Sequence, residues 1–261
     1  MSRQSGSSKH RSHHSKHTET NNEDLVEQIK GITTLLYEVA SYRPHEWETY
    51  VPSARSAMAA LDRIHFFRDP QRFAEQVWIL QGLQNYAFHD ADSGCVRDVA
   101  EFCQASWLRI LRNFPDNEQV LLGLASNWLQ RAQATISQIQ REEEAGKKSA
   151  ICSITTANSQ AGSDPRRQGP LYVEARGYLQ PAVDFYTRAV RAADTAGSTT
   201  GDLLSSAAES QMSLGNVTAP PGDERYFHQA IRFLRRAEAM PQYRLSVYMQ
   251  EYLNDYGRYV S

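Results

Sequence analysis

The chain has 261 residues, of which 41% are hydrophobic and 22% are charged, and its formal net charge is −2. This length can bury a real hydrophobic core in one large domain or two small ones, and the composition excludes whole-chain disorder. No apolar run approaches the roughly 18 residues needed to cross a bilayer, so we expect a soluble protein without a membrane segment.

A basic segment, MSRQSGSSKHRSHHSKHTETNN, comes first, and it has no large apolar residue after Met1. We therefore expect residues 1–21 to be disordered. Residues 1–20 carry a net charge of +3, and the remaining chain carries −5. Nuclear import through Lys9, Arg11 and Lys16 is the favoured role, and a nucleic-acid tail or disorder without a role stays an alternative. A transition-metal site is a further alternative, formed by His10, His13, His14 and His17.

Residues 22–143 are predicted to form a first helical half. Asn22 is suited to cap a helix that opens with acidic residues, and apolar residues then recur at steps of three and four. Asp69 and Pro70 form a second start signal, and NFPDN at 113–117 is a stop signal. The five predicted apolar stripes run over residues 25–39, 54–64, 73–80, 96–110 and 120–139.

Residues 144–170 interrupt this pattern with Gly, Ser, Asn and Pro, which predicts a flexible insertion between two helical halves. The second half, residues 171–261, is predicted to contain helices near 171–195, 202–214, 224–240 and 245–259. Pro181 should either kink the first of these or mark a new start. No segment alternates with a period of two, so we predict an all-α protein of about nine helices.

One frame occurs twice in the second half, as AVDFYTRAV at 182–190 and AIRFLRRAE at 230–238. Its spacing of small and bulky residues resembles the second helix of a tetratricopeptide unit, with a partner helix between the copies that ends in a left-handed cap at Gly215. The period of 48 differs from the family value of about 34. The sequence therefore favours stacked, tetratricopeptide-like helical hairpins, and chance similarity between alanine-rich helices is the alternative.

The helix predicted at 224–240 carries a basic face, which is a candidate partner-binding site. Guanidinium groups at this spacing could bind phosphates or an acidic peptide. The simpler interpretation is a solvated face partly paired with Asp223, Glu224 and Glu238. The candidate residues are Arg225, His228, Arg232, Arg235 and Arg236.

The sequence offers little support for catalysis. It contains no Gly-rich phosphate loop, no HExxH and no Gly-x-Ser-x-Gly motif. His89, Asp90 and Asp92 could hold a cation, but a polar turn that caps the next helix is favoured. Three cysteines without a CxxC spacing are typical of a reducing interior. We expect no catalytic residue, no metal site, no cofactor and no small-molecule substrate.

The order of these features, with LASNWLQRAQ at 124–133, YFHQAIRFLRRA at 226–237 and YMQEYLNDYGRYV at 248–260, resembles filamentous-fungal helical proteins, in particular the hypoxia-responsive morphology factor family. This resemblance implies a nuclear regulatory adaptor that acts through protein partners, touches nucleic acid only indirectly, and influences genes for colony and biofilm morphology under low oxygen. The alternative from the residues themselves is a cytosolic helical-repeat adaptor that binds an acidic or phosphorylated peptide.

Overall fold

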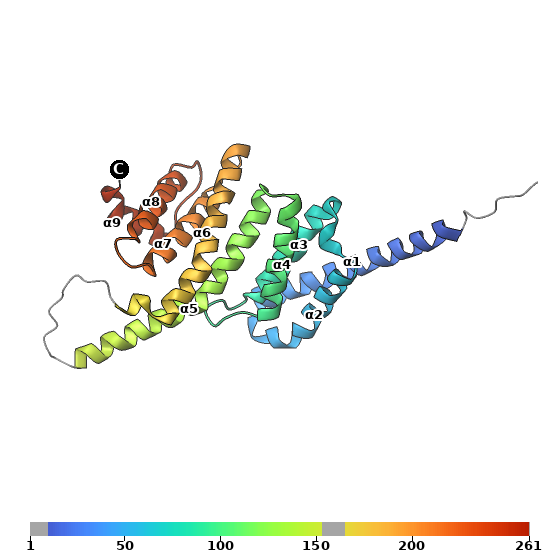
Figure 1. The fold of residues 1–261 in the computed structure, drawn as a ribbon, viewed down its shortest axis with the longest axis horizontal. Coiled ribbons are helices and arrows are strands. Elements are labelled where there is room, and N and C mark those ends of the chain that lie inside the picture. Colours follow the sequence, from blue (N-terminus) through green and yellow to red (C-terminus); the bar gives the residue numbers. More distant parts are fainter. Residues whose placement is uncertain (1–9, 153–164, 261) are drawn as a thin grey trace, which may run out of the picture.

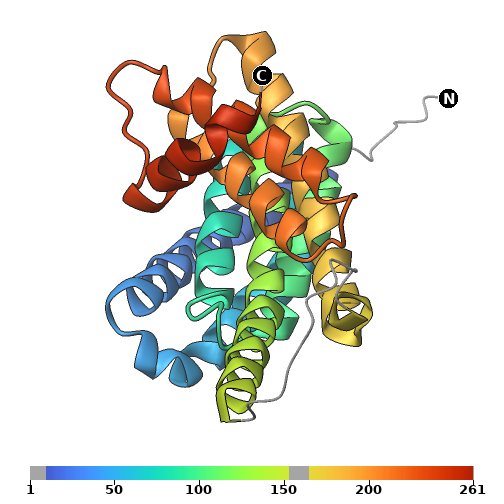
Figure 2. The same ribbon diagram turned by 90° about the vertical axis from the view of Figure 1, so that its left-hand side faces the viewer.

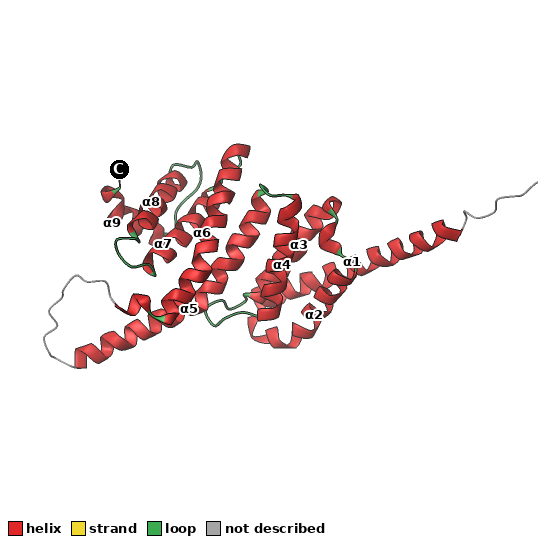
Figure 3. Ribbon diagram, in the orientation of Figure 1, coloured by secondary structure: helices red, strands yellow, loops and turns green. Residues whose placement is uncertain are grey.

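The computed structural model describes the backbone of residues 10–152 and 165–260, and the side chains of 21–146 and 167–260. Every regular element in this part of the chain is helical, as predicted (Figure 3). Short 3-10 turns connect several of the helices. The nine α-helices are α1 (His10–Tyr42), α2 (Trp47–Arg63), α3 (Phe73–Ala87), α4 (Arg97–Asn113), α5 (Glu118–Cys152), α6 (Pro170–Ala196), α7 (Gly201–Asn216), α8 (Glu224–Glu238) and α9 (Val247–Tyr256).

Two helices are longer than the sequence pattern indicated. The predicted start at Asn22 is wrong, because α1 begins at His10, and α5 continues to Cys152 through the first part of the predicted insertion. Of the predicted tail and insertion, residues 1–9 and 153–164 lie outside the described residues. The extra helical stretches, 10–21 and 144–152, contain no proline. Since extending an existing helix needs no new nucleus, low apolar content did not end them.

From α3 to α9, each helix packs against the next one in the chain, and these helices follow one another across the molecule (Figure 1). Helix α1 packs against both α2 and α3, so α3 lies mainly against α1 and α4 rather than against α2, and the turned view shows the same helices from one end (Figure 2). The connections α4–α5, α6–α7 and α7–α8 are short, which folds the chain back on itself as helical hairpins. Pro181 lies inside α6 and does not mark a new start. The predicted stack of helical hairpins is therefore confirmed.

Helix α5 joins two hydrophobic cores. Val120 and Leu124 pack into the core formed with α1 to α4, whereas Leu121 and Ala125 pack into the core formed with α6 to α9. All four side chains are at most 1% exposed. Because one helix contributes to both cores, the two halves are packed against each other rather than connected only by a linker.

The repeated frame occupies equivalent positions of α6 and α8. Ala182 and Ala230 are fully buried, and so are Ala189 and Ala237. The repeated arginines also act alike, since each bonds back to the preceding part of the stack. Arg188 donates to the Pro115 carbonyl at 3.0 Å, and Arg236 to the Asp194 carboxylate of α6 at 2.5 Å.

Two glycines show where the predicted helix ends differ from the structure. A left-handed cap at Gly215 is wrong, because this residue lies inside α7 and has no positive φ. A Cβ at Gly215 would lie 2.7 Å from the Phe227 ring, so the glycine lets α8 approach. The left-handed cap is instead Gly197, with φ of 68°, at the end of α6.

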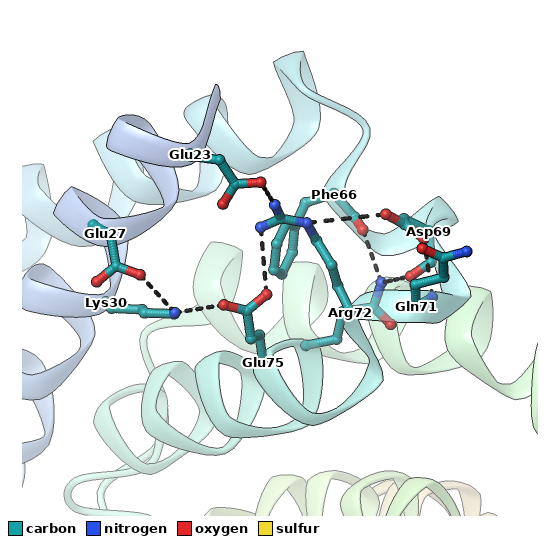
Figure 4. A network of polar contacts seen from close by, with 9 residues as sticks. Glu23, Glu27, Lys30, Phe66, Asp69, Gln71, Arg72 and Glu75 are labelled. Atoms are coloured by element: carbon teal, nitrogen blue, oxygen red, sulfur yellow. Dashed lines mark hydrogen bonds and ion pairs between the residues drawn. The ribbon is translucent and has the colours of Figure 1, made fainter. Parts of the chain in front are cut away.

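A network of charges attaches α1 to the start of α3 (Figure 4). Arg72 forms ion pairs with Glu23 of α1 and, at 3.3 Å, with Glu75 of α3. Lys30 pairs with Glu27 at 2.7 Å and also with Glu75. These hydrogen bonds to Glu27 and Glu75 raise the pKa of Lys30. Since both cations are already paired, the network orients α1 and leaves no free cation for a ligand.

Candidate functional site

The residues of the predicted basic face of α8 have different partners in the structure. Arg235 donates to the carbonyls of Gly257 and Val260, at 2.8 and 2.7 Å, and so holds the 3-10 turn that follows α9. Arg236 pairs with Asp194, and Arg225 lies over the Tyr226 ring, 4.5 Å from its centroid. The five basic residues therefore do not form one continuous free face.

Two members of the predicted face have no partner among the described residues, namely His228 and Arg232, and both are exposed. The acidic residues expected to pair with this face do not do so. Glu238 accepts from Gln250 at 2.9 Å, and Asp223 lies 3.8 Å from Arg167. The predicted pairing with Asp223 and Glu238 is therefore wrong, because these carboxylates contact Arg167 before α6 and Gln250 of α9, whereas the predicted exposure of the basic side chains to solvent is found.

Beside this helix lies a groove of 540 Å³, formed by α6 and α8 with α7 beneath. Two bridges cross from α8 to α6. The Tyr226 hydroxyl donates to the Gln180 side-chain carbonyl at 3.2 Å, and Arg236 reaches Asp194. Early residues of α8 thus meet earlier residues of α6, and late residues meet late ones, so the two helices run in the same direction.

The lining of the groove combines apolar and polar side chains. Val183, Val190 and Phe233 supply apolar surface, and Gln211 is the residue of α7 that lines the groove. Gln211 is only 5% exposed, yet no hydrogen bond joins its amide to any other described residue. The polar side-chain atoms that are enclosed without a partner belong to other residues, so the Gln211 amide is in contact with the solvent of the groove and is accessible to a ligand there.

The groove lining carries one positive charge more than it carries negative charges, because it contains Arg191, Arg225 and Arg236 but only two carboxylates, Asp184 and Asp194. Asp194 is already engaged, because Thr199 and Arg236 donate to it and lower its pKa although burial acts in the opposite direction. Asp184 accepts a hydrogen bond from the neutral Gln180 amide at 3.0 Å and has no cationic partner among the described residues, so it keeps its negative charge at this point of the groove. Arg191 has no partner among the described residues, and Arg225 donates to the Tyr226 hydroxyl but has no carboxylate partner, so its other N–H groups stay free. The groove therefore presents two guanidinium groups that are available to an anion.

Arg232 adds to this positive edge by its place in the helix. It follows Arg225 by seven residues and precedes Arg236 by four, so the three arginines share one side of α8. The sequence pattern indicates Arg225, Arg232 and Arg236, but it gives no sign of Arg191 or Gln211. Both lie in elements that the repeated frame predicted, α6 and the helix between the copies, but only the packing shows which of their side chains reach the groove.

A second groove, of 690 Å³, lies between α2 and the start of α4. Its arginines already have partners, since Arg55 pairs with Asp98 at 2.6 Å and Arg97 with Glu101 at 2.9 Å. It also lacks a buried polar side chain comparable to Gln211. The groove between α6 and α8 is therefore the better candidate for a ligand site.

The other candidates from the sequence do not come together as sites. His89 stacks on Trp47 with ring centroids 4.8 Å apart, and Asp92 accepts from Ser137 at 3.2 Å. The helix that follows them, α4, has no side-chain cap, so the predicted capping role is wrong. Within the described ranges, no three potential metal ligands form a group.

The side chains of the candidate import residues lie outside the described part of the structure. Lys9 lies outside the described residues, and Arg11 and Lys16 lie in the helical backbone of α1, where side chains are not described.

In the described part of the chain, no helix combines the length and hydropathy that a membrane span requires. Comparisons with protein-family models, with curated proteins and with solved structures found no match to this chain.

Proposed function

We propose that this protein is a non-enzymatic adaptor that captures an anionic segment of a partner protein in the groove between α6 and α8. The observation that carries the proposal is the pair of guanidinium groups, Arg191 and Arg225, on a groove where Asp194 is already paired with Arg236 and Asp184 is the remaining carboxylate of the lining. Guanidinium groups bind carboxylates and phosphates through paired N–H donors, so both acidic and phosphorylated segments suit this edge.

Association should be favoured by charge and by apolar burial together. The rim arginines attract an anionic chain from solution, while Val183, Val190 and Phe233 offer apolar contact once it has entered. Because the rim is exposed, the charged contribution should weaken as salt is added.

Fluorescence anisotropy with labelled peptides tests this function. Glutamate-rich, phosphoserine-containing and glutamine-substituted peptides of one sequence separate carboxylate binding, phosphate binding and charge-independent binding. Replacing Arg191 and Arg225 by Ala should weaken the anionic peptides by about tenfold or more. The matched control is Arg63→Ala with Arg112→Ala, since both side chains are exposed, have no partner among the described residues and lie outside the groove. Equal binding by both double variants would refute the proposal.

The nuclear, hypoxia-linked role implied by the family resemblance is a separate proposal, and a nuclear protein partner is compatible with the same groove. Its test is a large fluorescent fusion in which Lys9, Arg11 and Lys16 are changed to Ala. Import through these residues predicts a shift to the cytoplasm, and a fully nuclear variant would favour the cytosolic adaptor.

A further inference from the structure

We infer that the groove reads an extended segment at three points: an anionic side chain at each end, bound by Arg225 and Arg191, and a main-chain amide between them, bound by Gln211. This inference rests on the proposed function and adds the conformation and spacing of the ligand to it.

The spacing follows from the direction of the helices. Arg225 is adjacent to Tyr226, which bonds to Gln180 of α6, so Arg225 marks the level of Gln180 along the groove. Gln180 and Arg191 are eleven residues apart in α6, which corresponds to a rise of about 16 Å. An extended chain advances about 3.3 Å per residue, so this distance corresponds to about five residues.

The main-chain contact follows from the chemistry of Gln211. Its side chain has one carbonyl and one NH₂ group, which together match the N–H and C=O of a peptide backbone. It is almost completely buried, lines the groove, and has no partner among the described residues. Its amide atoms are not enclosed, so they reach the solvent of the groove, and the main chain of a ligand there would replace water as their partner.

This contact also selects the conformation of the ligand. A helical ligand has satisfied its internal backbone groups already, whereas an extended one has free N–H and C=O groups along its length. The Gln211 amide therefore favours an extended segment. Because it contacts main chain, the groove should tolerate different side chains between the two anionic positions.

Spacing is tested with labelled ten-residue peptides that carry two Glu residues separated by two, five or eight positions in an otherwise uncharged sequence. Anisotropy titrations should show the tightest binding at a separation of about five. Arg191→Ala and Arg225→Ala should each reduce that preference, and the Arg63→Ala control should keep it.

The main-chain contact is tested by replacing the central amide of the best peptide with an ester, which removes one N–H donor. The ester should weaken binding to the unchanged protein by about two- to tenfold, the value of one hydrogen bond. With Gln211→Met, a variant of similar size without the amide, the ester should have almost no effect. Circular dichroism and urea unfolding establish that each variant is folded.

The outcomes separate this inference from the function on which it rests. If anionic peptides bind with the same affinity at every spacing, or the ester acts equally on both proteins, the three-point reading is wrong and the anionic adaptor stands. If no anionic peptide binds, both are wrong.

Discussion

Replacing Gly123 by Ala tests how tightly α5 packs against α4. A Cβ at this position would lie 2.5 Å from the nearest atom of the Trp107 ring. The ring cannot move away easily, because it is fully buried and its Nε1 donates to the Gln84 side chain at 3.0 Å. The Gln84 amide in turn donates to the Gly123 carbonyl, so the glycine, the tryptophan and the glutamine form one unit.

The size of the effect comes from a comparison with a second glycine. Gly31 lies in α1 with nothing within 4 Å of an added Cβ, so Gly31→Ala gains only helix propensity, about 1 kcal/mol. Gly123→Ala gains the same amount but adds overpacking of about 1–3 kcal/mol and loss of a buried hydrogen bond of about 1 kcal/mol. The two variants should therefore differ by about 2–4 kcal/mol.

Urea unfolding followed by circular dichroism measures both free energies. Gly31→Ala should be slightly more stable than the unchanged protein, and Gly123→Ala should be less stable than Gly31→Ala by the stated difference. If the two variants have the same free energy of unfolding, the close contact between Gly123 and Trp107 does not exist as described.

Three further predictions concern packing, pH and thiol chemistry. Ala230→Phe should destabilise the protein by about 1–3 kcal/mol in thermal or urea unfolding because Ala230 is fully buried, whereas Gln229→Phe should cost much less. Equal losses of stability would mean that the buried side of α8 is not the one described. The hydrogen bond from Arg55 lowers the pKa of Asp98, so this pair stabilises the fold above the pKa of the unfolded state and stops doing so as pH falls through the pKa of the folded state. Asp98→Asn should therefore reduce the loss of stability that the protein shows below about pH 5. The same dependence of unfolding free energy on pH in the variant and in the unchanged protein would contradict the pairing. Complete burial raises the pKa of the Cys103 thiol. In a variant with Cys95→Ser and Cys152→Ser, a thiol reagent should therefore label Cys103 only when the protein unfolds, and labelling should become faster as urea is added. Labelling at the rate of a free thiol would contradict the burial of Cys103.

Much of the fold could be predicted because helical periodicity is a local signal. The apolar stripes identified all nine helices of the described residues, and Asp69 caps the turn before α3 by accepting from the Gln71 amide. The ends were harder to predict. A helix can continue through polar residues when nothing breaks it, as α1 does, and Gly215 looked like a cap although its role is to admit Phe227.

The candidate site could be predicted only in part, because the partners of an arginine depend on tertiary contacts. The sequence identified a basic side of α8, but Arg235 and Arg236 look alike in the sequence and have different roles. Arg235 bonds to carbonyls near the end of the chain, and Arg236 bonds to α6. No sequence pattern indicates a role for Gln211, because its position in the groove depends on how α6 and α8 pack over α7.

The most direct measurement of the central claim is a reversal of charge in the groove. The variant Arg191→Glu with Arg225→Glu should lose affinity for a glutamate-rich peptide and gain affinity for the same peptide with Lys in place of Glu. The same reversal at Arg63 and Arg112, outside the groove, should leave the preference for glutamate unchanged. An anisotropy titration in which the groove variant still prefers the glutamate peptide, or in which the control variant switches as strongly, would contradict the assignment of the groove between α6 and α8 as the binding site.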